Sequence, residues 1–137
     1  MHKNTQKIFN TLFKNNKPSN QTTSIGQRTE TLACNYLLKN KLTLIERNYR
    51  CQRGEIDLIM RDHQSLVFVE VRYRKNIRFG TSLESISPYK LNRLKTAINH
   101  YTMTNNLGYI ACRIDVIGLH GKLEQPNIQW LKNIITD

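Results

Sequence analysis

One run of residues restricts the possible folds of this chain more than any other, namely Leu66-Val67-Phe68-Val69-Glu70-Val71. Side chains alternate between the two faces of a strand, so apolar residues at nearly every position require a strand that is covered on both sides. Two further segments with strand character precede it, and the turn residues Asp62-His63-Gln64 separate the second from the third. We therefore expect an antiparallel meander of three strands, at Leu42 to Tyr49, Glu55 to Arg61 and Ser65 to Tyr73, with the last strand in the middle of a sheet.

Two helices are expected to flank these strands. Ser24 is a suitable N-cap with Gln27 three residues later, and apolar residues then recur at helical spacing until about Asn40. Ser87-Pro88 marks the second helix start, because proline at the first helical position lacks only an N–H that has no partner there. The remaining elements are a strand, a turn and a final strand, at Tyr109 to Leu119, Gly118 to Gly121 and Ile128 to Ile135. The predicted order is α-β-β-β-α-β-β, an α/β domain with a mixed central β-sheet between helices.

The charge balance indicates the class of partner. With 21 Lys and Arg against 10 Asp and Glu, the formal net charge of +11 would attract any polyanion, nucleic acid first and an anionic membrane surface second. Residues 1–22 contain no acidic residue and are rich in Asn, Thr, Gln and Lys, which predicts a disordered basic tail. The alternative for this tail is a short cationic amphipathic helix. The rest of the 137 residues, 23–137, fits a single domain.

The cysteines and the hydropathy pattern indicate the compartment. Cys34, Cys51 and Cys112 are odd in number and form no Cys-x-x-Cys pair, so we expect reduced thiols rather than disulfides or a zinc site. No apolar run approaches the ~20 residues that span a bilayer. We therefore expect a cytoplasmic protein with no stable membrane association.

Two carboxylates lie in strands predicted to be buried, Asp57 within Ile56-Asp57-Leu58-Ile59 and Glu70 within the central run. A charged carboxylate is costly there unless it is paired, hydrogen-bonded or bound to a metal ion. Glu70 and Arg72 share one face of their strand, which places a cation beside a carboxylate. This pattern favours a divalent-cation site with a neighbouring group for a phosphate. The alternative is a pair of structural ion pairs with Arg72 or Arg113.

Two residues at the edges of the helical apolar stripes extend this hypothesis. Glu30 borders the stripe of the first helix and is a candidate third metal ligand, although a glutamate at such a boundary is often simply solvated. Lys90, in the first turn of the second helix, could reach the same pocket. Its alternative is a surface lysine that extends past a core helix.

A basic loop with interleaved aromatic residues follows the central strand, from Arg72 to Gly80. Such a loop suits contacts with phosphates while a ring stacks on an unpaired base, although charged runs are often only solvated surfaces. The four histidines show no ligand spacing, and we expect no catalytic role for them. The expected nucleic-acid-binding residues are Arg53, Arg72, Arg74, Lys75 and Arg78.

Several blocks of the chain together resemble the YraN family, a group of small and largely uncharacterised bacterial proteins regarded as endonuclease-like. The resemblance covers nearly everything from Ser24 onward. The blocks are Gly26-x-x-x-Glu30-x-x-Ala33-x-x-x-Leu37, Arg47-Asn48-Tyr49-Arg50, Arg53-Gly54-Glu55-Ile56-Asp57-Leu58-Ile59, Val67-Phe68-Val69-Glu70-Val71-Arg72-Tyr73-Arg74 and Arg113-Ile114-Asp115-Val116.

The resemblance implies a restriction-endonuclease-like core of the PD-(D/E)-x-K superfamily, similar to Holliday-junction resolvases. It implies that Asp57 and Glu70 bind Mg²⁺ or Mn²⁺, with Glu30 as an additional acid. Two departures stand out, since Ile56 replaces the proline of the motif and Arg72 replaces its lysine. Arginine stays protonated, so we expect Arg72, together with Lys90, to hold the phosphate rather than to move a proton.

These expectations combine into a function. The leading hypothesis is a Mg²⁺-dependent endonuclease that hydrolyses DNA phosphodiester bonds, with branched or junction DNA among the expected substrates. The alternative is a catalytically inactive nucleic-acid-binding protein on the same fold, and a third is a membrane-surface protein directed by its basic tail. Junction cleavage would require two sites, which leaves a homodimer open.

Overall fold

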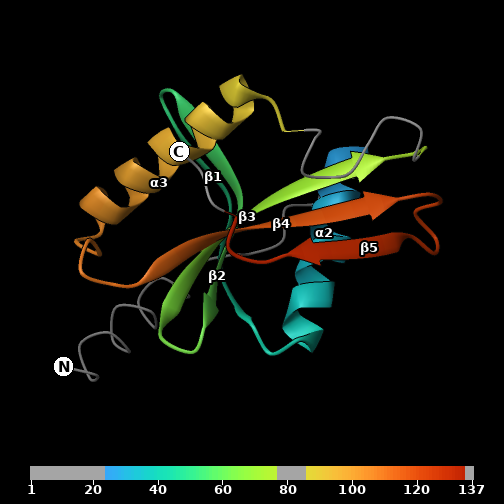
Figure 1. The fold of residues 1–137 in the computed structure, drawn as a ribbon, viewed down its shortest axis with the longest axis horizontal. Coiled ribbons are helices and arrows are strands. Elements are labelled where there is room, and N and C mark those ends of the chain that lie inside the picture. The colour runs from blue at the N-terminus through green and yellow to red at the C-terminus, as the bar shows by residue number, and fades with distance from the viewer. Residues whose placement is uncertain (1–23, 77–85, 135–137) are drawn as a thin grey trace.

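The computed structural model describes residues 24–76 and 86–134, so the predicted basic tail and Arg78 lie outside the described residues. The observed order of elements is the predicted α-β-β-β-α-β-β (Figure 1). The elements are α2 (Ile25–Lys39), β1 (Thr43–Cys51), β2 (Gly54–Asp62), β3 (Ser65–Arg74), α3 (Pro88–Thr104), β4 (Cys112–His120) and β5 (Asn127–Leu131).

The strands form one mixed sheet in the order β1-β2-β3-β4-β5. Neighbouring strands are antiparallel except β3 and β4, which run parallel over the whole register from Leu66 opposite Cys112 to Arg74 opposite His120. Parallel strands require a crossover, and α3 lies within that connection. The predicted central position of β3 is therefore confirmed.

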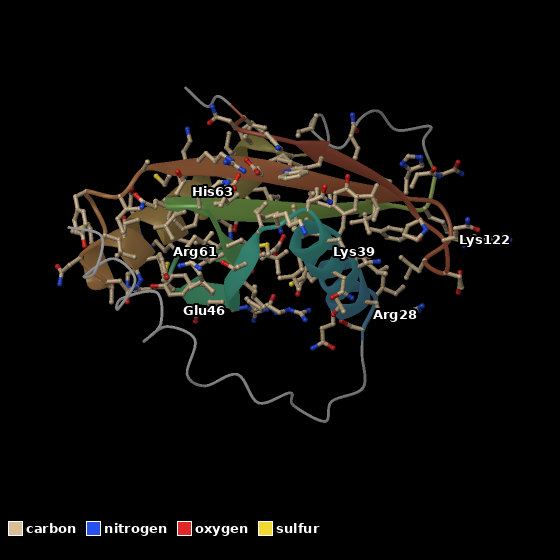
Figure 2. All side chains as sticks on the ribbon, turned by 90° about the horizontal axis from the view of Figure 1, so that it is seen from below. Arg28, Lys39, Glu46, Arg61, His63 and Lys122 are labelled. Atoms are coloured by element: carbon tan, nitrogen blue, oxygen red, sulfur yellow. The ribbon has the colours of Figure 1, made fainter. Side chains whose placement is uncertain are left out.

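The two helices cover opposite faces of the sheet (Figure 1). One apolar cluster joins Phe68 of β3 to Leu94 and Tyr101 of α3, and the other joins Val67 and Val69 of β3 to the α2 residues Ala33 and Leu37. Seen from below, α2 lies against one face of the sheet with its labelled residues Arg28 and Lys39 (Figure 2). Neither α2 nor α3, the helices of the described ranges, is long and apolar enough to cross a membrane.

Both helices begin where the sequence predicts. The Ser24 hydroxyl accepts the N–H of Gln27 at 3.2 Å while the Gln27 side chain accepts the N–H of Ser24, which forms the expected capping box. The Ser87 hydroxyl accepts the N–H of Lys90 at 3.1 Å, with Pro88 in the first turn. This cap fixes the first turn of α3, from which the Lys90 side chain extends.

The ends of the last two strands differ from the prediction. Tyr109 to Ala111 belong to the turn after α3 rather than to β4, because the N–H of Ile110 donates to Leu107 instead of to a neighbouring strand. Gly118 lies within β4, paired with Arg72 and Gln129, so the predicted turn begins only at Gly121. The final strand ends at Leu131, since the N–H of Asn133 donates to the buried Asp115 carboxylate.

Gly54 sets the separation between β2 and α3. It is buried, and a β-carbon there would lie 2.4 Å from the Arg93 carbonyl oxygen and 2.7 Å from the Ala97 nitrogen. Both atoms belong to the helix backbone and cannot move without the helix. Glycine therefore allows α3 to lie directly on the start of β2.

We predict that Gly54→Ala lowers the free energy of unfolding by about 1–3 kcal/mol, the usual cost of forcing a methyl group into a filled core. Gly108→Ala is the matched control, because a β-carbon at Gly108 meets nothing within 4 Å. Urea denaturation of both variants measures the difference. Equal stabilities would contradict the close contact at Gly54.

Candidate functional site

Asp57 lies where the hydrogen-bonded ladder between β2 and β3 ends. The register of the two strands runs from Asp62 opposite Ser65 to Leu58 opposite Val69, and it does not continue to Asp57. The N–H of Val71 donates instead to Asp57 Oδ2 at 2.8 Å. The carboxylate thus takes the place of a backbone carbonyl and is held between the two strands.

Glu70 is the most buried ionisable side chain near Asp57, with a relative exposure of 2%. Its Oε1 atom has no hydrogen-bond partner. Two cations approach it without reaching hydrogen-bond distance, Arg72 Nη1 at 3.8 Å and Lys90 Nζ at 3.7 Å. The two cations therefore offset the negative charge of Glu70, but its Oε1 atom accepts no hydrogen bond.

Asp57 raises the affinity of the Glu70 carboxyl group for a proton. Burial and the charge of Asp57 raise the pKa of Glu70 to about 8, against the opposing effect of Lys90 and Arg72. Burial also raises the pKa of Asp57, although the Val71 N–H and Lys90 oppose it. The protonated Glu70 donates to Asp57, so at neutral pH the pair carries one negative charge rather than two.

Lys90 belongs to this site and is not merely a surface lysine. Its Nζ lies 3.2 Å from Glu55 Oε1 as well as near Glu70. Burial opposes the charged form of Lys90, but the carboxylates of Glu70, Glu55 and Asp57 outweigh it and raise the lysine pKa. Lys90 therefore stays a cation at neutral pH and can hold an anion.

Glu30 faces the site from α2. Burial and the charge of Asp57 raise its pKa, whereas a hydrogen bond from Asn48 and the nearby Arg47 lower it. Arg47 Nη2 lies 3.9 Å from Glu30 Oε2, which is buried without a hydrogen-bond partner. Glu30 is thus a half-buried carboxylate whose pKa is raised by the charge of Asp57, rather than one that is simply solvated.

The alternative that Arg113 neutralises the acidic pair does not hold. Arg113 Nη2 lies 2.9 Å from Asp62 Oδ2, and its Nε lies 3.0 Å from Asp115 Oδ1. Asp115 is fully buried and also accepts the indole N–H of Trp130 at 3.0 Å. This network is satisfied within itself and ties β4 to β5.

The donor set suits a hard divalent cation, which prefers carboxylate oxygen ligands. A cation could satisfy the unpartnered oxygens of Glu70 and Glu30, and it could replace the proton that the raised pKa keeps on Glu70. Across residues 24–76 and 86–134, however, no three His, Cys, Asp or Glu side chains are grouped closely enough to hold a metal ion. Within the described ranges, Asp57 and Glu70 are therefore a pair of candidate metal ligands rather than part of a group of three.

The predicted basic residues lie on two sides of the pair. Arg53 is exposed in the turn between β1 and β2, beside the contact of Gly54 with α3. Arg74 ends β3 two residues after Arg72, and the exposed Lys75 follows it. Arg78 lies outside the described residues.

A separate open cavity of about 320 Å³ lies beside α3. Its lining mixes apolar residues such as Phe68 and Ile114 with the polar Lys95, Asn99, Arg113 and Asn133, but includes neither Asp57 nor Glu70. Its walls carry no unpartnered carboxylate, so the acidic pair is the stronger candidate site.

Sequence reasoning missed Asn48 and Glu55. Asn48 has a φ of 55° inside β1, where Arg47 pairs with Leu58 and Tyr49 with Ile56, which places it opposite Asp57. Asparagine tolerates this left-handed conformation better than other residues with a side chain. The sequence indicated Glu55 only through its position two residues before Asp57. It did not indicate Asn48, because the contact of Asn48 with Glu30 joins distant parts of the chain.

Comparison with known proteins gives one family. Residues 29–119 match the model of "Uncharacterised protein family UPF0102", a range that includes the blocks from Glu30 to Val116 on which the YraN resemblance rests. A UPF0102 protein of Nitrosococcus oceani is 48% identical over 79% of this chain and 88% of the relative. Another, of Colwellia psychrerythraea, is 47% identical over 87% of this chain and 96% of the relative.

We predict that Asn48→Ala unfolds more easily than Asn48→Gly by about 1 kcal/mol, because alanine is strained in the left-handed region and glycine is not. Both variants lose the hydrogen bond to Glu30 equally. Thermal denaturation of the two proteins measures the difference. Equal melting temperatures would contradict the left-handed backbone at position 48.

We also predict that Glu70→Gln removes a pH dependence of stability. The folded pKa of Glu70 is raised from 4.5 to about 8, so its contribution is complete below pH 4.5 and is lost as the pH rises to 8. Near pH 8 the variant should be more stable than the wild type by a few kcal/mol, since a tenfold change in proton affinity corresponds to about 1.4 kcal/mol.

Urea denaturation from pH 5 to 8.5 in EDTA tests this, with Glu124→Gln as the control because Glu124 is exposed. Parallel profiles for the wild type and Glu70→Gln would rule out the raised pKa of Glu70.

Proposed function

This chain belongs to the uncharacterised protein family UPF0102, and we propose that it is a metal-dependent endonuclease that hydrolyses DNA phosphodiester bonds at the Asp57–Glu70 pair. One observation carries the proposal: Glu70 is buried beside Asp57 with an unpartnered carboxylate oxygen, and two cations stand within 4 Å of that oxygen. The complete ion pair of Arg113 with Asp115 hydrogen-bonds the carboxylate oxygens, whereas the ion pairs at Glu70 leave Oε1 without a hydrogen bond. Proteins keep such an arrangement most often where a ligand completes it.

The metal proposed for this site is Mg²⁺ or Mn²⁺, held by Asp57 and Glu70 with Glu30 as the additional acid. Bound there, the ion would supply Lewis acidity toward the phosphate and the attacking water. The residues of the chain would do the rest. Val71 fixes the Asp57 carboxylate through its N–H, and Asn48 orients Glu30.

Arg72 and Lys90 would hold the scissile phosphate. Both stand within 4 Å of Glu70 Oε1, so an anion bound against the pair would meet them directly. Arginine does not release its proton, and the raised pKa of Lys90 keeps it charged. Their role would therefore be to neutralise charge that grows on the phosphate in the transition state, not to transfer a proton.

DNA is the proposed substrate because the net charge is +11 and basic residues lie in the β1–β2 turn, at Arg53, and at the end of β3, at Arg74 and Lys75. The predicted resemblance adds to this proposal a restriction-endonuclease-like core and branched or junction DNA as a substrate. A homodimer is proposed because junction cleavage would require two sites. A cytoplasmic location is proposed from the expected reduced cysteines. The second candidate is an inactive nucleic-acid-binding protein on the same fold. It is favoured by the finding that no three potential ligands are grouped within the described ranges.

We predict cleavage of DNA that requires Mg²⁺ or Mn²⁺ and that falls more than about 100-fold in Asp57→Asn and in Glu70→Gln, because each change replaces a carboxylate that would bind the metal ion with an amide. The assay is a labelled panel of four-way junction, flap, duplex, single-stranded DNA and RNA. Glu124→Gln, which changes an exposed carboxylate in the β4–β5 turn, is the matched control.

Two results separate the candidates. Metal-independent cutting, or cutting that survives both pair variants, would come from a contaminant or another site. Salt-dependent binding without any cutting would establish the inactive binding protein instead.

A further inference from the structure

Two tyrosines among the described residues are largely exposed, Tyr89 at 72% and Tyr109 at 67%. Tyr89 lies in the first turn of α3, and Tyr109 lies in the turn after that helix. An exposed aromatic ring gains nothing from the core, so its surface is available to a ligand. Of the two, only Tyr89 has a described arginine against its ring and lies next to a residue of the candidate site.

A guanidinium group covers part of the Tyr89 ring. The Cζ atom of Arg93, one helical turn further along, lies 5.8 Å from the ring centroid. This cation–π contact holds the ring and the guanidinium next to each other as two flat groups. Together they form a rigid surface on which a further flat, electron-rich ring can stack.

This surface lies at the end of α3 from which Lys90 reaches the acidic pair. Tyr89 directly precedes Lys90, whose Nζ is 3.7 Å from Glu70 Oε1. The backbone of Arg93 touches Gly54, the neighbour of the exposed Arg53 in the β1–β2 turn. The ring therefore shares the first turn of α3 with the lysine that reaches the pair, and the Arg93 guanidinium lies against it.

We propose that Tyr89 and Arg93 form a stacking surface for an unpaired base of a nucleic-acid strand whose backbone runs past Arg53 and Lys90. Base faces are hidden inside a duplex and open in single strands, flaps and junction centres, so this surface selects unpaired nucleotides. Cations flanking an aromatic ring match a polyanion with flat bases better than an acidic peptide, which has no ring to stack. The inference rests on the proposed function, because that function places the phosphate to be cut at the Asp57–Glu70 pair.

The test is binding of a labelled single strand and of a blunt duplex of equal length, by fluorescence anisotropy with the full chain in EDTA. Tyr89→Ala should weaken single-strand binding about tenfold and duplex binding less than twofold, since stacking on an aromatic ring accounts for a loss of this size. Tyr89→Phe keeps the ring and should bind as the wild type does. Tyr109→Ala removes an equally exposed ring far from the pair and should change neither affinity.

A second readout separates stacking from charge. A 2-aminopurine base in the single strand should lose fluorescence on binding the wild type but not Tyr89→Ala. The salt dependence of affinity should be unchanged in Tyr89→Ala and lower in Arg93→Ala, because only the arginine can meet a phosphate.

Equal losses on both substrates, an unchanged affinity, or a Phe variant as weak as Ala would overturn the proposal. Because binding is measured without metal, the result is independent of turnover. Single-strand selectivity that depends on Tyr89 in a protein that cuts nothing would refute the nuclease and keep the stacking surface. Metal-dependent cutting by a protein whose single-strand binding is unchanged in Tyr89→Ala would keep the nuclease and refute the stacking surface.

Discussion

The contact of Gly54 with the backbone of α3 determines how the rest of the site is arranged. Because no β-carbon separates them, the helix lies directly on the start of β2, and its first turn reaches the point where β2 and β3 part. Lys90 can then contact both Glu55 and Glu70. A helix displaced outward would move the base of the Lys90 side chain away from the buried carboxylate, since packed backbones transmit such shifts.

The acidic pair is costly for folding, and the surrounding groups offset that cost only in part. Burying a carboxylate costs several kcal/mol unless charges and hydrogen bonds compensate it. The Val71 N–H and the protonated Glu70 compensate Asp57, and Lys90 and Arg72 reduce the charge at Glu70. One oxygen of Glu70 still lacks a hydrogen bond. The satisfied Asp115 network on β4 shows that this fold can bury a carboxylate completely paired, so the incomplete pairing at Glu70 is a property of that site.

Much of the site could be predicted from the sequence. Asp57 and Glu70 were predicted because a carboxylate inside an apolar strand can be recognised from the sequence alone. Arg72 was predicted to lie beside Glu70 because side chains two residues apart share one face of a strand. The family was predicted from the same blocks and is confirmed. Asn48 was not predicted because its hydrogen bond to Glu30 joins residues 18 positions apart. Its left-handed backbone inside a strand was not predicted either. The ends of β4 and β5 were misplaced for a similar reason, since backbone bonds to Leu107 and Asp115 compete with the strand ladder.

The sequence by itself determined the element order, the caps of both helices, the central position of β3 and the identity of the buried acids. These features follow from local rules of side-chain alternation, capping and apolar burial. Only the tertiary structure decided which cation meets which carboxylate: Lys90 reaches Glu70, whereas Arg113 turns to Asp62 and Asp115. Long side chains can reach several partners from one backbone position, and the choice among them depends on the packing of distant segments, which no local pattern records.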